Sequence, residues 1–437
     1  MQNGEKSFLD RYFYLSERKS NIKVELGGGL ATFMTMSYIL IVHPLIMKNA
    51  GMPMKEVFTV TALMSAIFTL FMGLYAKLPF ALAPAMGSNA FLAMTLVGSG
   101  AVTWQQGLAM NFVSGVIFVL MSIFGIREVI VKFLPKSLKL GIGATVGIFL
   151  IELGFKNGSL MKVVNGSISI GDVKSPAAIT AIFGIFITAI FIARKVKCDM
   201  LLGIVAATII GIPLGITKIP ESFIALPTGI GEIAFKLDFS NILSIKVLPI
   251  LFVFFVGDFF STLGTLLGVS EKAGLLDENG DLPEIQKPFL VDALGTVVGA
   301  LCGTTTITTF VESAAGVGAG AGGRTGLTAV FTSIFFFISL FLSPLALMVP
   351  AAATAPALII MGTLMLSGLK NVEYDNFTES FPVFFMVVAT AFTNSISNGV
   401  GAGIISYVIV KVGAGKYKEV SMGLYILAAI MVFYFIN

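Results

Sequence analysis

Charged side chains are scarce in this chain. Only 12% of the 437 residues are Asp, Glu, Lys or Arg, while 56% are hydrophobic. Soluble domains carry about twice that charged fraction. The low charge excludes an ordinary soluble protein and predicts a membrane protein. The modest net charge of +4 argues against nucleic acid as a partner.

Residues that form metal sites, disulfides and catalytic centres are also few. Cys198 and Cys302 are the two cysteines, and they are too few and too far apart for a disulfide framework or a metal site. His43, the single histidine, precedes Pro44 at the end of the first apolar run. We expect it to be an interfacial cap, with proton transfer as the alternative. No phosphate-binding loop or catalytic triad appears in the sequence, so we expect neither an enzyme nor a cofactor.

Apolar runs of about 20 residues, long enough to cross a bilayer, recur along the whole chain. They fall at residues 26–46, 55–76, 105–124, 137–154, 177–193, 199–216, 247–270, 324–343 and 350–367, with a shorter run at 289–302. The tail, 378–436, holds three apolar pieces. Two interrupted elements, at about 79–99 and 304–322, join these runs. The total is then fourteen spans if two of the tail pieces cross, and fifteen if all three do. The sequence thus predicts an all-α, multi-pass protein of the cell membrane.

Basic residues indicate which ends of the spans face the cytoplasm. Residues 1–25 carry five Lys and Arg residues and no early apolar core, so we expect a cytoplasmic arm and not a cleaved signal. The 127–139 loop and the 194–197 turn are also basic and lie on the same side in this count. By the positive-inside rule that side is cytoplasmic.

Two stretches interrupt the apolar pattern. Thr304–Val311 is almost wholly β-branched or aromatic and leads through Glu312 into a glycine-rich half-helix. Pro84 interrupts the second stretch, so a half-helix begins after it and places Asn89 near its first turn. Non-helical backbone is tolerated at membrane depth only where it is buried in protein or lines a cavity. Interrupted segments in both halves of a chain point to a transporter site, so we predict that these two form a pair at the substrate site.

Buried polar groups complete the predicted site. One helical face of the run 247–270 carries a carboxylate and three hydroxyls: Asp258, Ser261, Thr262 and Thr265. A carboxylate in mid-membrane indicates a functional site. Glu312 is expected where the dipole of its half-helix is positive, and Asn89 either binds the ligand or caps its half-helix. Asp292 is expected to pair with Lys287 at the edge of a span.

The expected site holds two carboxylates and an amide, with no basic side chain nearby. Ionised carboxylates only accept hydrogen bonds, whereas an amide both donates and accepts. A flat heterocycle with ring N–H groups fits these partners, and an inorganic anion would be repelled. Asp258 or Glu312 can also carry a proton, which would couple ligand binding to protonation.

The chain resembles the AzgA-like purine permeases of the nucleobase:cation symporter family 2. The resemblance runs from Phe8 to the last spans. It rests on GGLATFMTMSYIL (28–40), PAMGSNAF (84–91), STLGTLLGV (261–269), KAGLLDENG (272–280), FVESAAGV (310–317), GGRTGLTAV (322–330) and SISNGVGAGIISYV (395–408).

This resemblance implies seven-plus-seven inverted repeats in which the third and tenth spans are broken. The implied core domain comprises 26–124 and 247–343, the gate domain 125–216 and 344–437, and the extracellular loop 217–246. It also implies import of hypoxanthine, guanine or adenine coupled to H⁺, with Na⁺ less favoured. The family's ligand-contacting positions match Asn89, Asp258 and Glu312, while the choice between monomer and homodimer stays open.

Three departures from the family pattern bear on function. Ala85 replaces a usual Gly, Ser261 replaces a usual Asp, and the glycine stretch after Glu312 is two residues longer than the common pattern. Loss of a carboxylate at Ser261 leaves substrate preference and proton stoichiometry open. The main alternative is a transporter of the same fold for uracil, xanthine or an inorganic anion. A passive channel and a membrane enzyme are further alternatives, but the sequence shows neither a continuous polar lining nor a catalytic pair.

Overall fold

The computed structural model describes residues 7–124, 135–164, 167–196, 198–240, 282–317, 322–393 and 395–436. Between 240 and 282 it describes Asp258, Thr262, Thr265, Leu266, Val269, Ser270 and 273–277. The members of this set up to Ala273 are helical. Ser261, one of the predicted site residues, lies outside the described residues.

Helices dominate the described chain, and seven helical segments in it are long and apolar enough to cross a membrane. They are α2 (Ile22–Met36) with α3 (Ile39–Lys48), α4 (Met54–Phe71) with η1 (Met72–Ala76), α6 (Trp104–Ile123), α8 (Lys136–Asn157), α9 (Pro176–Ala193), α14 (Gly326–Ser339) with η5 (Leu340–Leu342) and α15 (Ser343–Leu347), and α16 (Ala351–Leu366) with η6 (Ser367–Asn371). The prediction of a largely helical, multi-pass membrane fold is confirmed at this level.

Shorter elements connect or interrupt the long helices. The helical ones are α1 (Phe8–Phe13), α5 (Met86–Ala90), η2 (Phe91–Val97), α10 (Asp199–Gly211), α12 (Gln286–Cys302), η4 (Val311–Ser313), α13 (Ala314–Val317), α17 (Phe377–Thr393), α18 (Ile396–Gly413), η7 (Tyr417–Glu419) and α19 (Met422–Ile436). The strands are β1 (Leu82–Pro84), β2 (Met161–Val164), β3 (Ser167–Ile170) and β4 (Ile307–Thr309). The tail thus forms three helices, one for each of its apolar pieces.

Polar residues between the apolar runs determine where several helices begin. The side chain of Asn21 accepts from the backbone N–H of Val24 at the start of α2. Thr103 and Gln106 form a reciprocal capping box at the start of α6. Such caps satisfy backbone donors that the first turn leaves unpaired, so the local sequence sets the helix boundaries.

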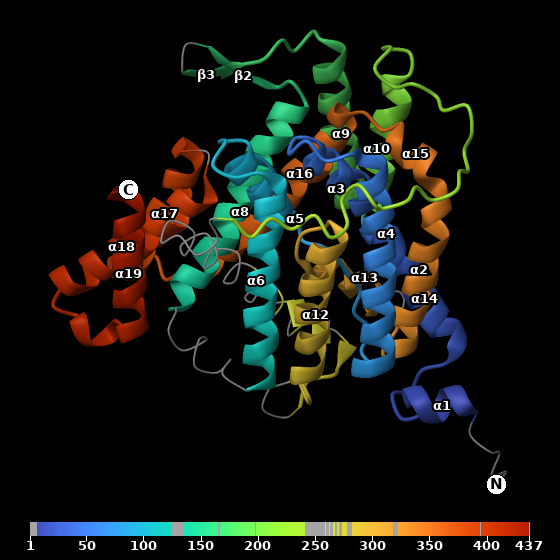
Figure 1. Ribbon diagram of the computed structural model, residues 1–437, viewed down its shortest axis with the longest axis horizontal. Coiled ribbons are helices and arrows are strands. Elements are labelled where there is room, and N and C mark those ends of the chain that lie inside the picture. The colour runs from blue at the N-terminus through green and yellow to red at the C-terminus, as the bar shows by residue number, and fades with distance from the viewer. Residues whose placement is uncertain are drawn as a thin grey trace.

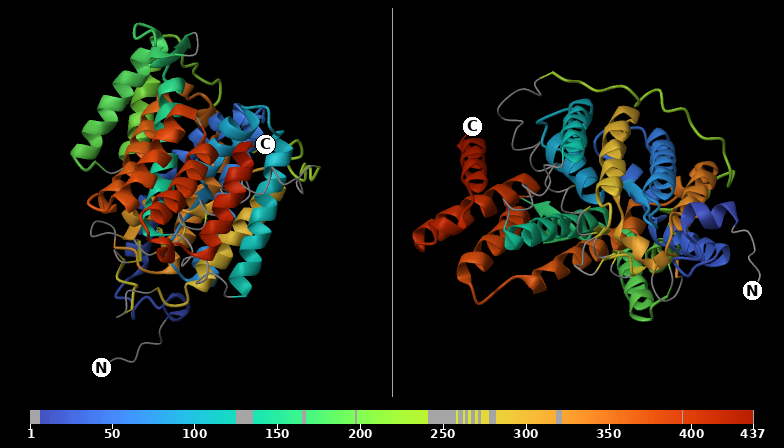
Figure 2. Two further views of the ribbon diagram at one scale, coloured as in Figure 1. Left: turned by 90° about the vertical axis from the view of Figure 1, so that its left-hand side faces the viewer. Right: turned by 90° about the horizontal axis from the view of Figure 1, so that it is seen from below.

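The helices pack in two groups. The first group contains α2, α3, α4, α6, α12 and α14, and the second contains α8, α9, α10, α16, α17, α18 and α19. Helices α17 to α19 lie at one end of the longest axis and α2 and α14 at the other, with the β2–β3 hairpin and α1 on opposite faces (Figures 1 and 2). Helix α8 makes most of the contact between the tail helices and the rest of the second group.

The two broken elements meet at the centre of the first group. Strands β1 and β4 pair antiparallel, with Leu82 opposite Thr309 and Pro84 opposite Ile307. Pro84 has no backbone N–H to donate to a partner strand. A two-stranded sheet tolerates this because both of its strands are edge strands. The prediction that the two interrupted stretches form a pair is therefore confirmed.

A run of threonines attaches β4 and the turn before it to the surrounding helices. The hydroxyl of Thr304 lies 3.0 Å from His43 Nε2 in α3, and that of Thr305 donates to Asn89 Oδ1 in α5. The Thr306 hydroxyl donates to Asn111 Oδ1 in α6 at 2.6 Å. Each hydroxyl thus contacts a different helix, and all of these threonines are buried.

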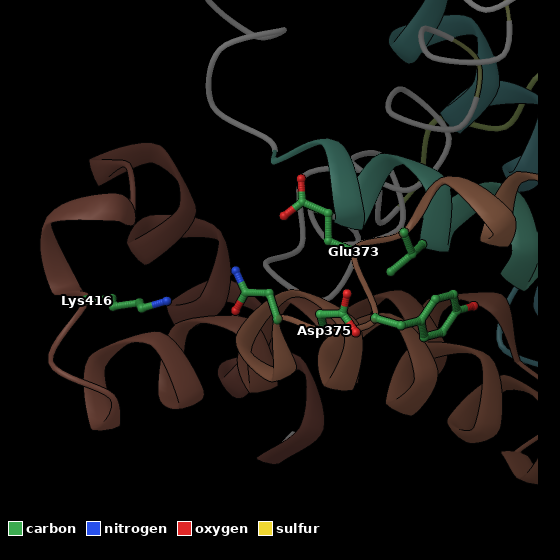
Figure 3. Close-up of a pocket in the computed structure, with 6 residues that line it drawn as sticks. Glu373, Asp375 and Lys416 are labelled. Atoms are coloured by element: carbon green, nitrogen blue, oxygen red, sulfur yellow. The ribbon is translucent and has the colours of Figure 1, made fainter.

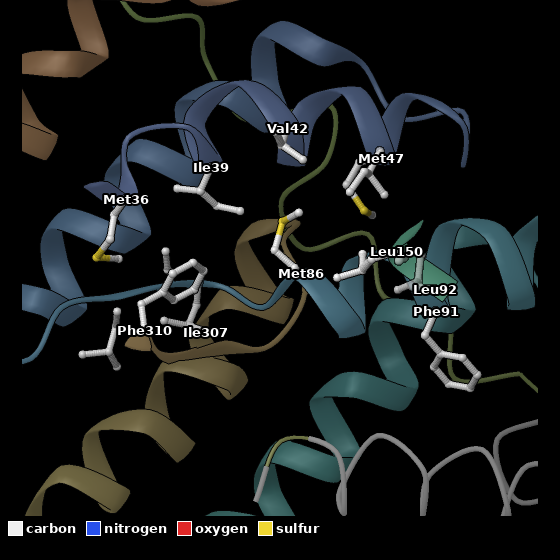
Figure 4. Packing of buried hydrophobic residues seen from close by; sticks show 14 of the residues in the cluster. Met36, Ile39, Val42, Met47, Met86, Phe91, Leu92, Leu150, Ile307 and Phe310 are labelled. Atoms are coloured by element: carbon white, nitrogen blue, oxygen red, sulfur yellow. The ribbon is translucent and has the colours of Figure 1, made fainter. Parts of the chain in front are cut away.

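Apolar packing encloses the crossing of the two strands. Met86 of α5 lies between α3 and the β4 segment, with Val42 on one side and Ile307 on the other (Figure 4). Small residues allow the closest approaches, since a Cβ on Gly316 would lie 2.1 Å from Thr32 Oγ1 and one on Gly28 would lie 2.8 Å from the Gly316 carbonyl. Such contacts let membrane helices pack closely.

A buried lysine and its ion pairs hold part of the second group together. Lys411 of α18 is 1% exposed, and its Nζ lies 2.6 Å from Glu379 Oε1 in α17 and 2.5 Å from Glu419 Oε2. Glu379 also accepts from the hydroxyls of Ser137 at the start of α8 and of Tyr407. Hydrogen bonds therefore fix the first turn of α8 to the start of α17.

A buried carboxylate anchors α14 in the first group. Glu25 of α2 is fully buried, and its Oε2 accepts from the backbone N–H groups of Thr325 and Thr328 at 3.2 and 3.1 Å. It also accepts from the Thr328 hydroxyl and, through Oε1, from the Arg324 N–H. A negative charge at a helix N-terminus is favoured by the helix dipole, so Glu25 caps α14 from a different helix.

We predict that Glu25→Ala lowers the free energy of unfolding by about 2 kcal/mol or more, because it leaves several buried donors without an acceptor. Glu25→Gln should lower the free energy of unfolding by less, since its amide oxygen still accepts hydrogen bonds. Thermal unfolding of the purified protein in detergent measures both effects, and Glu221→Ala, which removes an exposed carboxylate, is the control. An alanine variant as stable as the wild type would contradict the capping role.

Candidate functional site

A cavity of ≈ 290 Å³ lies between the two helix groups. On the side of the first group, where the broken elements lie, its lining residues are Tyr38, Ala85, Met86, Gly87, Ser88, Phe91, Asp258, Thr265, Thr308, Thr309, Phe310, Val311 and Glu312. The second group lines it with Lys139, Ile142, Gly143, Val146, Met361, Met365 and Ile396. Mostly apolar walls with a few polar groups are typical of a small-molecule site, and this volume suits a small ligand.

Glu312 enters the cavity at the end of the second broken element. It lies in η4, directly after the extended backbone of β4 and directly before α13. The Tyr38 hydroxyl donates to Glu312 Oε1 at 2.7 Å. Tyr38 is placed there by a break in the first predicted span, which forms α2 and α3 with Ser37 and Tyr38 between them. This carboxylate therefore has one fixed donor and further capacity to accept.

Asp258 is the second carboxylate of the cavity. Its side chain is 5% exposed, and the hydroxyls of Thr308 and Thr296 face it. Its Oδ1 has no hydrogen-bond partner among the described residues. A buried polar atom without a partner is costly, so the side chain is suited to receive a donor from a ligand.

Asp292 corrects a prediction made from the sequence. It does not pair with Lys287, which contacts Glu284 at 2.6 Å. Asp292 is fully buried in α12, where its Oδ1 accepts from the Thr262 hydroxyl and from the Thr309 N–H, both at 3.0 Å. The sequence signal was its position well inside an apolar helix that begins at Gln286.

Thr262 and Asn89 lie behind the cavity wall. Thr262 bridges Asp292 and Thr308, with its Oγ1 2.7 Å from Thr308 Oγ1. Asn89 accepts from Thr305, and its amide nitrogen donates to the Pro84 carbonyl at 3.4 Å. Its half-helix α5 has no side-chain cap, so the capping alternative is not what the structure shows. Thr262 thus contacts β4, which lines the cavity, and Asn89 contacts β1 and the turn before β4.

Two expectations about basic side chains are wrong. His43 is not at an interface: it is fully buried in α3 and contacts Thr304. Lys139, near the start of α8, lines the same cavity as Asp258 and Glu312, so a basic side chain does lie near the carboxylates. Its sequence position at the edge of a span gave no signal of this, because the approach of α8 to the broken elements is a tertiary contact.

A second hollow lies away from the strands. It is lined by residues 372–376 before α17 and by Lys416 after α18. Lys416 extends across it toward Glu373 and Asp375 (Figure 3). It shares no lining residue with the cavity that contains Asp258 and Glu312.

A cavity lined by two carboxylates lies among membrane-length helices, and the comparison with known families identifies a transport protein rather than an enzyme. The family model described as "Permease family" matches residues 24–402. The chain belongs to this permease family, and it is a multi-pass protein of the cell membrane.

Curated relatives extend over nearly the whole chain. The putative permease MJ0326 of Methanocaldococcus jannaschii is 39% identical over 98% of this chain and 98% of its own. The adenine permease AdeQ of Escherichia coli K12 is 38% identical over 98% of this chain and 96% of its own. The guanine/hypoxanthine permease PbuO of Bacillus subtilis is 37% identical over 93% of this chain and 96% of its own. These relatives confirm the resemblance to AzgA-like purine permeases.

Solved structures share the fold at low identity. The transmembrane domain of the cyanobacterial bicarbonate transporter BicA matches 88% of this chain and 97% of its own, with a TM-score of 0.63 and 15% identity. SLC26A9 matches 93% of this chain and 68% of its own, with a TM-score of 0.62 and 13% identity. At these identities the likeness establishes the fold alone.

We predict that Asp292→Ala destabilises the protein by about 2 kcal/mol or more, because the buried Thr309 N–H and Thr262 hydroxyl lose their acceptor. Asp292→Asn should cost less, since its carbonyl oxygen can replace Oδ1. Thermal unfolding in detergent distinguishes the two variants. Equal stability of the alanine variant and the wild type would show that β4 does not depend on this carboxylate.

Proposed function

We propose that this permease imports purine nucleobases (hypoxanthine, guanine or adenine) by coupling their entry to protons. The observation that carries the proposal is the pair of acceptor groups, Asp258 and Glu312, in one cavity with Asp258 Oδ1 unpartnered among the described residues. Purines present ring N–H groups that carboxylates accept. Relatives named as adenine and as guanine/hypoxanthine permeases support the same substrate class.

The proposed ligand lies flat between apolar surfaces. Phe91 and Phe310 line the cavity from the first group, and Met361 and Met365 line it from the second. Aromatic and methionine side chains pack well against a planar ring. Asp258 and Glu312 would then accept N–H groups at the edge of the ring, and Thr265 adds a hydroxyl.

Other residues predicted from the sequence act through these groups in this proposal. Thr262 and Asn89 hold the β4 segment in place, so we assign them to positioning the substrate site. Ser261 stays a predicted substrate-site residue. It stands three positions after Asp258 in the apolar run 247–270.

We propose that the two helix groups are the core and gate domains of a fourteen-span inverted repeat. The core comprises 26–124 and 247–343, and the gate comprises 125–216 and 344–437, with the arm 1–25 and the loop 217–246 outside them. The separate packing of the two groups and the position of the cavity between them support this division. Alternating access would then come from movement of one group against the other.

Proton coupling is assigned chiefly to Asp258, with Glu312 mainly a ligand acceptor. Asp258 faces Thr308, which Thr262 joins to Asp292, so two buried carboxylates share one hydrogen-bonded region. A proton on such a pair removes a buried negative charge. It therefore lowers the free-energy cost of moving the site past the apolar wall of the other helix group. Glu312 instead has a fixed donor in Tyr38 and lies at the start of a half-helix. H⁺ is preferred to Na⁺ on this basis.

An inorganic anion is the rival substrate, since BicA has the same fold and is named for bicarbonate. Lys139 in the cavity wall is the feature that would favour an anion. Two carboxylates line the same cavity, however, and they would repel one. The balance of charge therefore favours a neutral ligand with N–H donors.

Uptake of labelled hypoxanthine by cells that lack purine transporters tests the function. Adenine and guanine should compete with it, whereas sulfate and bicarbonate should not. Asp258→Ala and Glu312→Ala should each abolish uptake while leaving the protein in the membrane, because the ligand's N–H groups lose their acceptors. Glu152→Ala removes a carboxylate that pairs with Lys156 on α8 and is the control. Wild-type uptake by either site variant would refute the site.

The division of roles gives a separate prediction. Asp258→Asn should lose accumulation driven by a pH gradient yet still bind purine, since an amide cannot take up the proton. Glu312→Gln should weaken binding by about tenfold or more, because a charged acceptor is replaced by a neutral one. Binding to purified protein and gradient-driven uptake in proteoliposomes separate the two effects. The reverse pattern in the two variants would exchange the assigned roles.

A further inference from the structure

The gate-side wall of the cavity is built by one face of α8. Lys139, Ile142, Gly143 and Val146 all line the cavity. Their spacing of i, i+3, i+4 and i+7 places them on one side of the helix. This face lies opposite the half-helix and strand residues, and it provides the only cationic side chain among the described lining residues.

Gly143 differs from the other glycines of this helix. A Cβ on Gly147, one turn further on, would lie 2.6 Å from the Gly362 carbonyl, and one on Gly141 would lie 3.0 Å from Met386 Sδ. A Cβ on Gly143 would meet no heavy atom within 4 Å. Gly147 therefore allows α8 and α16 to pack closely, whereas Gly143 leaves space in the cavity wall.

Lys139 adds a hydrogen-bond donor to the same wall. When ionised, the carboxylates on the opposite side only accept hydrogen bonds, so in that state they cannot recognise a carbonyl oxygen of a ligand. An ammonium group carries three donors, and it can hold a partner in the protein and still donate to a ligand. Lys139 lies four residues, about one helical turn, from Gly143.

We propose that this face of α8 selects 6-oxopurines. Lys139 donates to the exocyclic oxygen, and the space at Gly143 admits a second exocyclic substituent, such as the 2-amino group of guanine. Hypoxanthine and guanine are then transported in preference to adenine, whose 6-amino group offers Lys139 no acceptor. This proposal rests on the purine transport proposed above. It resolves a choice that the relatives leave open, since their names include both adenine and guanine/hypoxanthine.

Competition against labelled hypoxanthine in proteoliposomes tests the proposal. In the wild type, guanine should inhibit at lower concentration than adenine. Gly143→Ala should raise the inhibition constant of guanine about tenfold relative to that of hypoxanthine, because a methyl group enters the space for the substituent. Lys139→Met should weaken the binding of hypoxanthine and guanine about tenfold and leave the binding of adenine nearly unchanged. Lys139→Arg should retain part of the preference, since it keeps a donor.

Controls separate recognition from folding. Gly143→Ala should unfold at or above the wild-type temperature, because alanine favours a helix and meets no neighbour. Gly147→Ala should unfold at a lower temperature, since its Cβ meets backbone, but should keep the wild-type ranking of purines. Folded Gly143→Ala and Lys139→Met with unchanged rankings, or a wild type that prefers adenine, would overturn the selectivity proposal alone. Failure of every purine to compete would overturn the proposed function as well.

Discussion

The structure depends on satisfying the backbone of two broken membrane elements. Non-helical backbone in an apolar environment leaves N–H and C=O groups that must find partners within the protein. Strands β1 and β4 provide part of this by pairing with each other. The rest comes from side chains: Asp292 accepts from the Thr309 N–H, and Ser313 Oγ accepts from the Ala81 N–H. The pairing of β1 with β4 positions the half-helices, and with them the cavity and its carboxylates.

The same requirement explains which parts of the site could be predicted. Pro84 and the β-branched run before Glu312 are local features that forbid a continuous helix, so the sequence alone predicts both breaks. Asp258 stands out because it is the one charged residue in the run 247–270. These features belong to single segments, so beyond the pairing of the two breaks the sequence does not predict which segments contact one another.

Partners distant in sequence could not be predicted. Asp292 and Thr262 are 30 residues apart, and His43 and Thr304 are 261 apart. A carboxylate near a lysine at a span's edge suggests a surface pair, and only the packing of α12 against β4 shows that Asp292 points inward. Lys139 was missed for the same reason, because its place in the cavity depends on how α8 approaches the half-helix of Gly87. Ser261 lies outside the described residues.

The two sides of the cavity are held by different forces. Directional hydrogen bonds join the threonine run to its helices. On the other side, the ion pair between Lys411 and Glu379 joins α18 to α17, and a hydrogen bond from Ser137 to Glu379 joins the start of α8 to α17. Between the groups, the approach of Gly87 to Val146 is an apolar contact, in which a Cβ on the glycine would lie 2.9 Å from the valine methyl. Hydrogen bonds fix a register, whereas apolar contacts are non-directional.

Substrate choice on this fold must therefore come from the few polar side chains that reach the cavity. BicA is named as a bicarbonate transporter, and a murine Slc26a9 structure, also similar in fold at a TM-score of 0.61, is named as an anion transporter. The backbone arrangement alone does not distinguish such proteins from a purine permease. In this chain Asp258 and Glu312 place acceptors on the side held by hydrogen bonds, and Lys139 places a donor on the α8 side. A neutral ligand that donates at one edge and accepts at the other satisfies both sides at once, whereas the two carboxylates would repel an inorganic anion.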